Sequence, residues 1–472
     1  FNTLLLRNVR SASRLLIFFN CLSHLTFFFT VYCNFFLQVI YLPYNSYQKF
    51  EVIKMNYIES NNLAVIACPG GEAFADLTIE NLRHIYAHKF YNQSKKLAKR
   101  YSFAENEMIQ KFNFYSDLFS NRMSVSNDTE KFHLPKFKVD ARFTYFMNGE
   151  FKTEILETIR GKDVYIFQDV ENKQPITINE GKNNIVFSVN DHLMSLIVTI
   201  DAVRHAGAGR ISLVLPVYPY SRQHKKKGRE GLTASLLGHI YENLDVEQII
   251  TLDIHSREIE NAFHSTRLQN LHASYQIIRE LTRIVDLSAD SEEEFVVVSP
   301  DSGAVDRNKF YSSGLQKPLA MIYKERDYSI VTQNAKQSNI ISIKLLGDVD
   351  GKNAFLADDM LGTGGTLLKG MEFLKSKGAK KVIAAVSLPF FTGDAIKLFD
   401  EAYEKGLFYR VIGTNAVYHT ELKQKEWYIE TDVSGLFAQV IARLHENQSL
   451  SGLLDNRSII EKLLKNASVG KK

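Results

Sequence analysis

The chain has 472 residues, which is enough for two or three α/β domains that each bury a core of their own. Its 57 Lys and Arg residues nearly balance its 53 Asp and Glu residues, so composition excludes a protein that binds nucleic acid or an acidic membrane through bulk charge. Three cysteines exclude a disulfide framework and have no zinc-ligand spacing, which favours a reducing, cytoplasmic setting.

Residues 1–54 differ in composition from the rest of the chain. From residue 15 to residue 42 there is no Asp, Glu, Lys or Arg, and this apolar stretch is long enough for a transmembrane segment or a signal anchor. The chain begins with Phe1, however, and Met55 precedes a stretch typical of the start of a soluble domain. We therefore predict that residues 1–54 are an upstream extension and that residues 55–472 contain no membrane segment. A genuine leader is the alternative.

Short apolar runs alternate with amphipathic stretches from residue 63 onward, a pattern typical of parallel α/β proteins. The strands that this pattern predicts are residues 63–67, 164–168, 211–216, 249–253, 295–299, 319–323, 355–358 and 382–387. The predicted helices are residues 191–205, 233–243, 366–377 and 432–446.

Residues 91–138 interrupt this pattern, because they are rich in Lys, Asn, Ser and Phe and lack strand periodicity. We predict a partly helical surface insertion there, inside an N-terminal domain of residues 55–280. A cluster of Ser, Asp and Glu at residues 287–294 marks the division from a C-terminal domain, which we assign to residues 281–472.

The most informative stretch is residues 354–366, where a predicted strand is followed by Asp358 and Asp359, a loop rich in Gly and Thr, and a helix. Glycines let backbone N–H groups close around a phosphate, and the helix N-terminus adds donors and a favourable dipole. The two carboxylates can accept hydrogen bonds from a ribose diol. We interpret the segment as a phosphoribosyl site. The alternative is an ordinary strand–turn–helix connection with a surface acidic pair.

Two further predicted strands end in residues that can bind metal or phosphate. The strand at 295–299 leads to Asp301, and the strand at 249–253 leads to His255. The two side chains could flank one metal ion; the alternatives are an N-cap role for Asp301 and a structural role for His255. A basic cluster at residues 222–229 is either solvated surface or a charge clamp for a triphosphate.

Taken together in chain order, these segments resemble the ribose-phosphate pyrophosphokinases, also called PRPP synthetases. Type I phosphoribosyltransferases share only the segment at 354–366 and are usually single-domain chains of about half this length. The other matching segments are an adenine loop at residues 146–150, a helix start at 190–194, an ATP loop at 218–223, metal segments at 252–255 and 298–301, and a catalytic loop at 321–326.

The resemblance implies an α/β fold of two tandem type I phosphoribosyltransferase-like domains, each a mostly parallel sheet flanked by helices. It implies transfer of the β,γ-pyrophosphoryl group of ATP to the 1-hydroxyl of ribose 5-phosphate, which gives PRPP and AMP for nucleotide biosynthesis. Mg²⁺ is the implied cofactor. A homo-oligomer is also implied, at least a dimer and expected to be a hexamer, because residues 146–150 would complete the ATP site of a neighbouring subunit. No nucleic-acid partner is expected.

The resemblance also implies roles for individual residues. The catalytic residues would be Lys324 and Arg326. The residues that bind ATP would be Phe146, Asn148, Glu150, Arg222, Gln223 and His255, and those that hold the metal would be His255 and Asp301. The residues that bind ribose 5-phosphate would be Asp358, Asp359, Gly362, Thr363, Gly364, Gly365 and Thr366.

The chain departs from the family pattern close to these residues. Gly362 stands where the family usually has a third Asp, and His224 stands where it usually has an Asp. The alternative to an active enzyme is a catalytically silent, regulatory homologue. Such homologues typically lose the catalytic Lys or the metal ligands, whereas this chain keeps Lys324, His255 and Asp301, so we favour the enzyme.

Overall fold

The computed structural model describes residues 62–107, 136–179, 181, 183–226, 228–288, 291–326 and 340–469. The chain divides into two compact units, Phe1–Asn56 and Tyr57–Lys472, and the described residues all belong to the second. The predicted extension at residues 1–54 lies outside the described residues, as does the 108–135 part of the predicted insertion. Within the described ranges, every helix is too short or too polar to cross a membrane.

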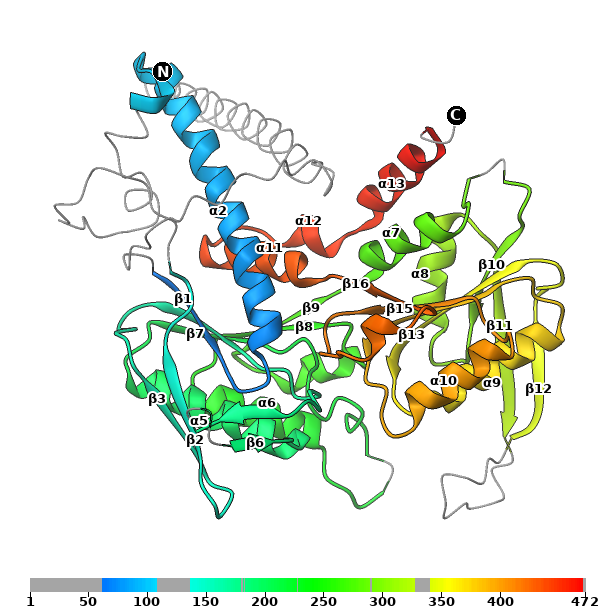
Figure 1. Ribbon diagram of the computed structural model, residues 1–472, viewed down its shortest axis with the longest axis horizontal. Helices are drawn as coiled ribbons and strands as arrows, with labels where there is room; N and C mark the ends of the chain where they lie inside the picture. The colour runs from blue at the N-terminus through cyan, green and yellow to red at the C-terminus, as the bar shows by residue number, and fades with distance from the viewer. Residues whose placement is uncertain are drawn as a thin grey trace, which may run out of the picture. The chain divides into compact units, whose positions relative to one another are not determined.

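The N-terminal half is built on a parallel sheet with the strand order β1-β4-β7-β8-β9. Helices α5 and α6 lie on one side of this sheet, and α2 and α11 lie on the other (Figure 1). The strands are β1 (Leu63–Ala67), β4 (Asp163–Phe167), β7 (Arg210–Val214), β8 (Gln248–Leu252) and β9 (Arg267–Leu271). The helices are α2 (Glu72–Tyr101), α5 (Val189–His205), α6 (Thr233–Asn243) and α11 (Ser434–His445).

Two antiparallel hairpins accompany this sheet, and neither was predicted from the sequence. The first pairs β2 (Ala141–Tyr145) with β3 (Phe151–Ile155). The second pairs β5 (Ile176–Ile178) with β6 (Asn183–Ile185). Their strands are short and only partly apolar, so they lack the long apolar runs on which the strand predictions depended.

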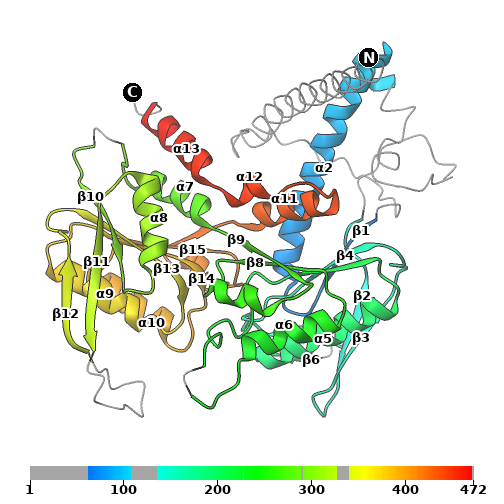
Figure 2. The ribbon, with the colours of Figure 1, turned by 180° about the vertical axis from the view of Figure 1, so that it is seen from behind.

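The C-terminal half is built on a sheet with the order β12-β11-β10-β13-β14-β15-β16, in which only the edge strand β12 runs antiparallel. Helices α7 and α8 lie on one side of it, and α9 and α10 lie on the other (Figure 2). The strands are β10 (Phe295–Ser299), β11 (Leu319–Arg326), β12 (Ile340–Leu346), β13 (Asn353–Leu361), β14 (Val382–Pro389), β15 (Arg410–Thr414) and β16 (Tyr428–Thr431). The helices are α7 (Ser274–Ile284), α8 (Val305–Leu315), α9 (Gly365–Ser376), α10 (Ala395–Glu404), α12 (Ser451–Leu454), α13 (Arg457–Val469) and the 3₁₀ turn η3 (Leu422–Gln424). A second 3₁₀ turn, η2 (Arg257–Ala262), belongs to the N-terminal half, between β8 and β9.

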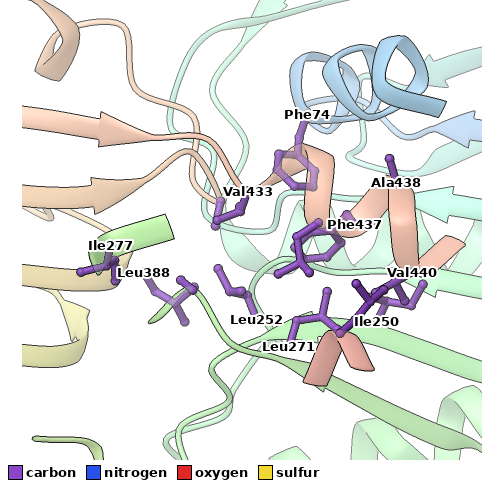
Figure 3. Close-up of a cluster of buried hydrophobic side chains, with 14 of the residues drawn as sticks. Phe74, Ile250, Leu252, Leu271, Ile277, Leu388, Val433, Phe437, Ala438 and Val440 are labelled. Carbon is purple, nitrogen blue, oxygen red and sulfur yellow. The ribbon is translucent and has the colours of Figure 1, made fainter. Parts of the chain in front are cut away.

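The strands β1, β4, β8, β10 and β14 are buried on both faces, as expected for parallel strands between two helical layers. Along β1 the side chains alternate between two apolar clusters: Val65 joins the cluster that contains Phe437 of α11, and Ile66 joins the cluster under α5 and α6. The first cluster continues into the C-terminal sheet, where Ile277 of α7 and Leu388 of β14 belong to it (Figure 3). One apolar core therefore links the two sheets, and each such buried side chain contributes about 1.5–3 kcal/mol.

The predicted fold class, two mostly parallel sheets flanked by helices, is confirmed. The bounds of β1, β10 and α6 agree with the predicted ranges, and Ser188 starts α5 through a capping box with Asp191. Residues 91–101, predicted as part of the insertion, form the C-terminal third of α2. The proposed boundary at 280/281 falls within α7, whose Gln276 carbonyl accepts a hydrogen bond from Thr431 of β16 at 3.4 Å.

Candidate active site

The carboxylate pair Asp358 and Asp359 lies near the carboxyl end of β13, the central strand of the C-terminal sheet. The buried side chain of Asn308 in α8 fixes this strand end. Its amide donates to the Ala357 carbonyl at 2.8 Å and accepts from the Ala357 N–H at 3.0 Å. The Asp359 N–H donates to Asp358 Oδ1 at 2.9 Å. The two carboxylates are thus held next to each other and interact with the same neighbouring charge.

Arg307, the neighbour of Asn308 in α8, supplies that charge. Its Nη1 lies 3.8 Å from Asp358 Oδ1 and 3.5 Å from Asp359 Oδ1. Burial and the charge of Asp359 raise the pKa of Asp358 to about 7. Burial also opposes ionisation of Asp359, but a hydrogen bond from His255 and the charge of Arg307 outweigh it and hold the Asp359 pKa below its usual range. Asp359 therefore ionises more readily than Asp358.

His255 follows β8 and connects the N-terminal sheet to this carboxylate pair. Its Nδ1 lies 2.6 Å from Asp359 Oδ2. Because an ionised carboxylate only accepts, the Nδ1–H of His255 donates and its Nε2 remains for a ligand. The side chain is 36% exposed, so a ligand can reach the ring. His255, which is predicted to bind ATP and the metal, is thus hydrogen-bonded to Asp359, which is predicted to bind the ribose.

The Gly/Thr loop follows β13 directly. Gly364 is the N-cap of α9, with a φ of 75° and no side-chain cap. A Cβ at this position would clash with the ring of Phe399, so both the backbone conformation and the space require glycine. Thr363 and Thr366 are exposed on either side of the cap. The N–H groups in the first turn of α9 have no carbonyl acceptor within the helix, so they are available to bind a phosphate.

Arg222 extends from the loop after β7 to the same region. Its Nε lies 3.3 Å from the sulfur of Met360, and its guanidinium carbon lies 5.6 Å from the centroid of the Phe390 ring. A Cβ at Gly362 would lie 3.5 Å from Arg222 Nη2, an ordinary van der Waals distance. The predicted ATP-binding Arg222 and the predicted ribose-phosphate loop therefore border one space, and Gly362 leaves that space open beside the guanidinium.

The two residues after Arg222 make specific contacts of their own. Gln223 Oε1 accepts a hydrogen bond from the Thr233 hydroxyl at 2.7 Å. His224 Nδ1 lies 3.1 Å from the carbonyl oxygen of Ser221. The His224 ring packs edge to face on the His255 ring, with centroids 5.3 Å apart and planes at 68°. The loop after β7 is therefore tied both to α6 and to the end of β8.

Asp253, two residues before His255, is buried and fully bonded. His272 Nδ1 donates to its Oδ1 at 2.8 Å, and the Ala273 N–H and the Ser387 hydroxyl donate to its Oδ2 at 3.1 and 2.6 Å. Burial opposes ionisation, but the hydrogen bond from His272 helps to hold the Asp253 pKa below its usual value. Because Ser387 belongs to β14, this carboxylate is a structural link between the two sheets.

Asp301 bonds within its own turn, three residues before the N-cap of α8. Its Oδ1 accepts the N–H groups of Gly303 and Ala304 at 2.9 and 3.1 Å. Across the described ranges no cluster of three or more His, Cys, Asp or Glu is arranged to hold a metal by itself. The donor set still suits a partly hydrated cation, since Asp301 Oδ2 and His255 Nε2 have no hydrogen-bond partner among the described residues. A metal shared by Asp301 and His255 stays a prediction.

The predicted adenine loop is the turn between β2 and β3. The Phe146 N–H donates to the Glu150 carbonyl at 2.9 Å, and the Glu150 N–H donates to Asn148 Oδ1 at 3.2 Å. The side chains of Phe146, Asn148 and Glu150 are exposed. In the described part of the chain, no hydrogen bond or ion pair joins them to the other predicted site residues.

The predicted catalytic pair lies on a strand rather than in a loop, because β11 extends to Arg326. Lys324 pairs with Ile343 of β12, and Arg326 pairs with Ile340. The side chains of Lys324 and Arg326 lie outside the described part of the chain.

Three residues of the site had no role in the sequence analysis. Arg307 could have been found, because α8 follows β10, and a cation near the start of that helix lies close to the end of the neighbouring strand β13. Asp253 lies within the predicted metal segment at 252–255, but that segment did not indicate its bond to Ser387, and Phe390 gave no signal. Their contacts depend on how the two sheets meet, and nothing in the local sequence encodes that.

Comparisons with known proteins point to one family. Residues 130–244 match the N-terminal domain of ribose phosphate pyrophosphokinase, and residues 264–426 match the phosphoribosyl transferase domain. The ribose-phosphate pyrophosphokinase A of Dictyostelium discoideum is 36% identical over 66% of this chain and 88% of its own. The ribose-phosphate pyrophosphokinase 2 of Schizosaccharomyces pombe is 35% identical over 65% of this chain and 87% of its own.

A solved structure extends this similarity to three dimensions. The crystal structure of phosphoribosylpyrophosphate synthetase from Mycobacterium smegmatis is similar with a TM-score of 0.58 and 25% identity, over 82% of this chain and all of that one. The resemblance inferred from the sequence motifs is confirmed. The chain belongs to the ribose-phosphate pyrophosphokinase family.

Proposed function

We propose that this chain transfers the β,γ-pyrophosphoryl group of ATP to the 1-hydroxyl of ribose 5-phosphate, for use in nucleotide biosynthesis. The hydroxyl oxygen forms a bond to the β-phosphorus, the bond from that phosphorus to the α,β-bridging oxygen breaks, and the hydroxyl proton is released. The products are PRPP and AMP. Catalysis of such a transfer consists mainly of positioning and of stabilising the charge that develops on the phosphate oxygens.

The observation that carries this proposal is the meeting of two sets of residues at the facing ends of the two sheets. Arg222 and His255 come from the N-terminal sheet, and both contact residues between Asp359 and Phe390 of the C-terminal half. A nucleotide held by the first set and a sugar phosphate held by the second would lie next to each other. That proximity is the main requirement for a transfer between two bound substrates.

The proposed roles of the sugar-phosphate residues follow from their chemistry. Asp358 and Asp359 would accept hydrogen bonds from the ribose hydroxyls, with Arg307 limiting the repulsion between them. The 5-phosphate would lie at the N-terminus of α9, held by Thr363, Thr366 and backbone N–H groups, with Gly362, Gly364 and Gly365 giving the backbone close access.

The proposed roles of the remaining residues concern the pyrophosphoryl group and the nucleotide. Lys324 and Arg326 would stabilise charge on the transferring group. Arg222 and Gln223 would bind ATP, with Phe146, Asn148 and Glu150 contacting the adenine from a neighbouring subunit. His255 and Asp301 would hold Mg²⁺. When bound, that ion would neutralise charge on the phosphate oxygens. The homo-oligomer and the cytoplasmic location stay predictions.

The test is AMP formation from ATP and Mg²⁺ by the full chain, with and without ribose 5-phosphate. We expect AMP release that depends on ribose 5-phosphate and that falls by about 100-fold or more in Lys324→Ala, since one lost charge contact of this kind typically has that effect. Lys344→Ala, on the neighbouring strand β12, is the matched control and should retain activity. A folded, nucleotide-binding chain that forms no AMP would favour the silent regulatory homologue instead.

A further inference from the structure

The edge-to-face histidine pair, His224 and His255, is unexplained by the roles proposed so far. The two residues follow β7 and β8, which are adjacent parallel strands, so both emerge at the same edge of the N-terminal sheet. Their ring centroids lie 5.3 Å apart with planes at 68°. His224 stands where the family usually has Asp. This chain therefore has two imidazole rings at this place, from His224 and His255, where the family usually has one imidazole and one carboxylate.

Both rings are oriented through Nδ1. His224 Nδ1 lies 3.1 Å from the Ser221 carbonyl oxygen, and His255 Nδ1 lies 2.6 Å from Asp359 Oδ2. Since a carbonyl and an ionised carboxylate only accept, each Nδ1 carries the hydrogen and each neutral ring has its lone pair on Nε2. Metal-binding histidines are typically oriented in this way, with the second ring nitrogen donating to a carboxylate or a backbone carbonyl.

The distance between the rings fits two ligands of one ion. Two imidazoles with metal–nitrogen bonds of about 2.1 Å place their ring centroids about 5 Å apart when they bind neighbouring positions. Neither Nε2 has a hydrogen-bond partner among the described residues. His224 lies in the basic cluster at residues 222–229, and Lys225 of this cluster is paired with Glu258 at 3.0 Å, which offsets part of the charge that would repel an ion.

We propose that His224 and His255 form a two-nitrogen half-site that selects a first-row transition ion, such as Mn²⁺, over Mg²⁺. Imidazole nitrogen suits such ions, whereas Mg²⁺ favours oxygen ligands and retains its water. Water, together with the predicted ligand Asp301, supplies the other ligands when the chain is alone, and phosphate oxygens of ATP replace some of the water in the working enzyme. The binding of ATP phosphate oxygens to the ion rests on the proposed function, whereas the binding of the ion by the two histidines does not.

The test measures binding of Mn²⁺ alone to the full chain, without nucleotide, by electron paramagnetic resonance. We expect pulsed spectra with couplings to two ¹⁴N nuclei in the wild type and to one in His224→Asn. We also expect the Mn²⁺ affinity to fall by about 10-fold or more in His224→Asn, while the weaker Mg²⁺ affinity, measured by competition, changes by less than about 2-fold. Thermal unfolding of each variant verifies that it is folded.

The chain offers a matched control in a second histidine pair. His239 and His264 have ring centroids 6.0 Å apart, but their planes are nearly parallel at 16°. His239→Asn should leave the Mn²⁺ affinity and both nitrogen couplings unchanged. One nitrogen coupling or none in the wild type, or equal Mn²⁺ affinity in the wild type and His224→Asn, would overturn the half-site even if the chain forms AMP. Two couplings in a chain that forms no AMP would overturn the proposed function and leave the half-site intact.

Discussion

The ends of β8 and β13 both present buried carboxylates, yet they use them in opposite ways. At the end of β8, both oxygens of Asp253 are occupied by protein donors, one of them from the other sheet. At the end of β13, Asp358 and Asp359 are held against each other and share Arg307. The first arrangement stabilises the fold, while the second retains capacity to accept hydrogen bonds from a ligand. A carboxylate at a strand end is thus a functional candidate only when its bonds to the protein are incomplete.

The largest effect that tests this contrast is expected on activity, from Asp359→Asn. The variant loses the negative charge and one of the two acceptor oxygens, which serve His255 Nδ1–H and the Met360 N–H, but Asp358 can then ionise beside Arg307, so the fold keeps its buried ion pair. We expect AMP formation to fall by about 100-fold or more, with a thermal midpoint within about 3 °C of the wild type. Steady-state kinetics together with thermal unfolding measures both. Activity within about 3-fold of the wild type would mean that the β13 pair is structural like Asp253.

The reverse pattern is expected for Asp253→Asn, whose effect should fall on stability. An amide cannot accept all the hydrogen bonds that the ionised Asp253 accepts, so we expect a loss of about 3 kcal/mol in the free energy of unfolding. Ser387→Ala removes one of those bonds and should cost about 1 kcal/mol. Urea unfolding of the two variants measures this. A loss below about 0.5 kcal/mol in Asp253→Asn would refute the proposed link between the sheets.

A pH dependence with a definite sign is expected for Asp358. Its pKa rises from the ordinary 3.8 to about 7 in the folded chain, so between these values the folded chain holds a proton that the unfolded chain releases. The stability contributed by this proton is complete below a pH of about 4 and is lost as the pH rises through about 7. Relative to Asp358→Asn, the wild type should therefore lose stability across that range, as thermal unfolding at several pH values would measure. Parallel curves for the two proteins would contradict the shift.

The smallest effect is expected at Gly362, beside the contact between the two halves. An Asp side chain there would begin 3.5 Å from Arg222 Nη2, in a position to form an ion pair with it. We expect Gly362→Asp to fold normally and to change the KM for ATP or ribose 5-phosphate by less than about 5-fold, since an exposed ion pair contributes at most about 1 kcal/mol. A loss of activity above about 50-fold would mean that the open space beside Arg222 is itself required.

The fold was largely predictable where apolar runs are long and bounded by turns. The run of four apolar residues in β10, followed by Ser299 and Pro300, gave its bounds directly, because both faces of that strand are buried. The polar C-terminal third of α2 did not resemble a helix, because Asn92, Gln93 and Ser94 interrupt its apolar positions. The hairpin β2–β3 was not predicted for a similar reason, since its strands alternate only weakly between buried and exposed side chains.

The candidate site was predictable as a set of segments but not as a set of contacts. The motif at residues 354–366 identified the carboxylates and the glycine loop. The bond from His255 to Asp359 joins residues 104 apart in sequence, and the bond from Ser387 to Asp253 joins residues 134 apart. Such contacts depend on how two sheets pack together, and no local pattern in a single sequence encodes that packing.

The most direct test of the proposed transfer is to follow the β-phosphorus itself. ATP labelled with ³²P at the β position would be incubated with the full chain, a divalent cation and ribose 5-phosphate, and the labelled products would be separated. A pyrophosphoryl transfer predicts that the label leaves the nucleotide together with the γ-phosphate and appears on the sugar, with unlabelled AMP in equal amount. Label that remains in ADP, or that appears as free pyrophosphate without the sugar product, would contradict the proposed function.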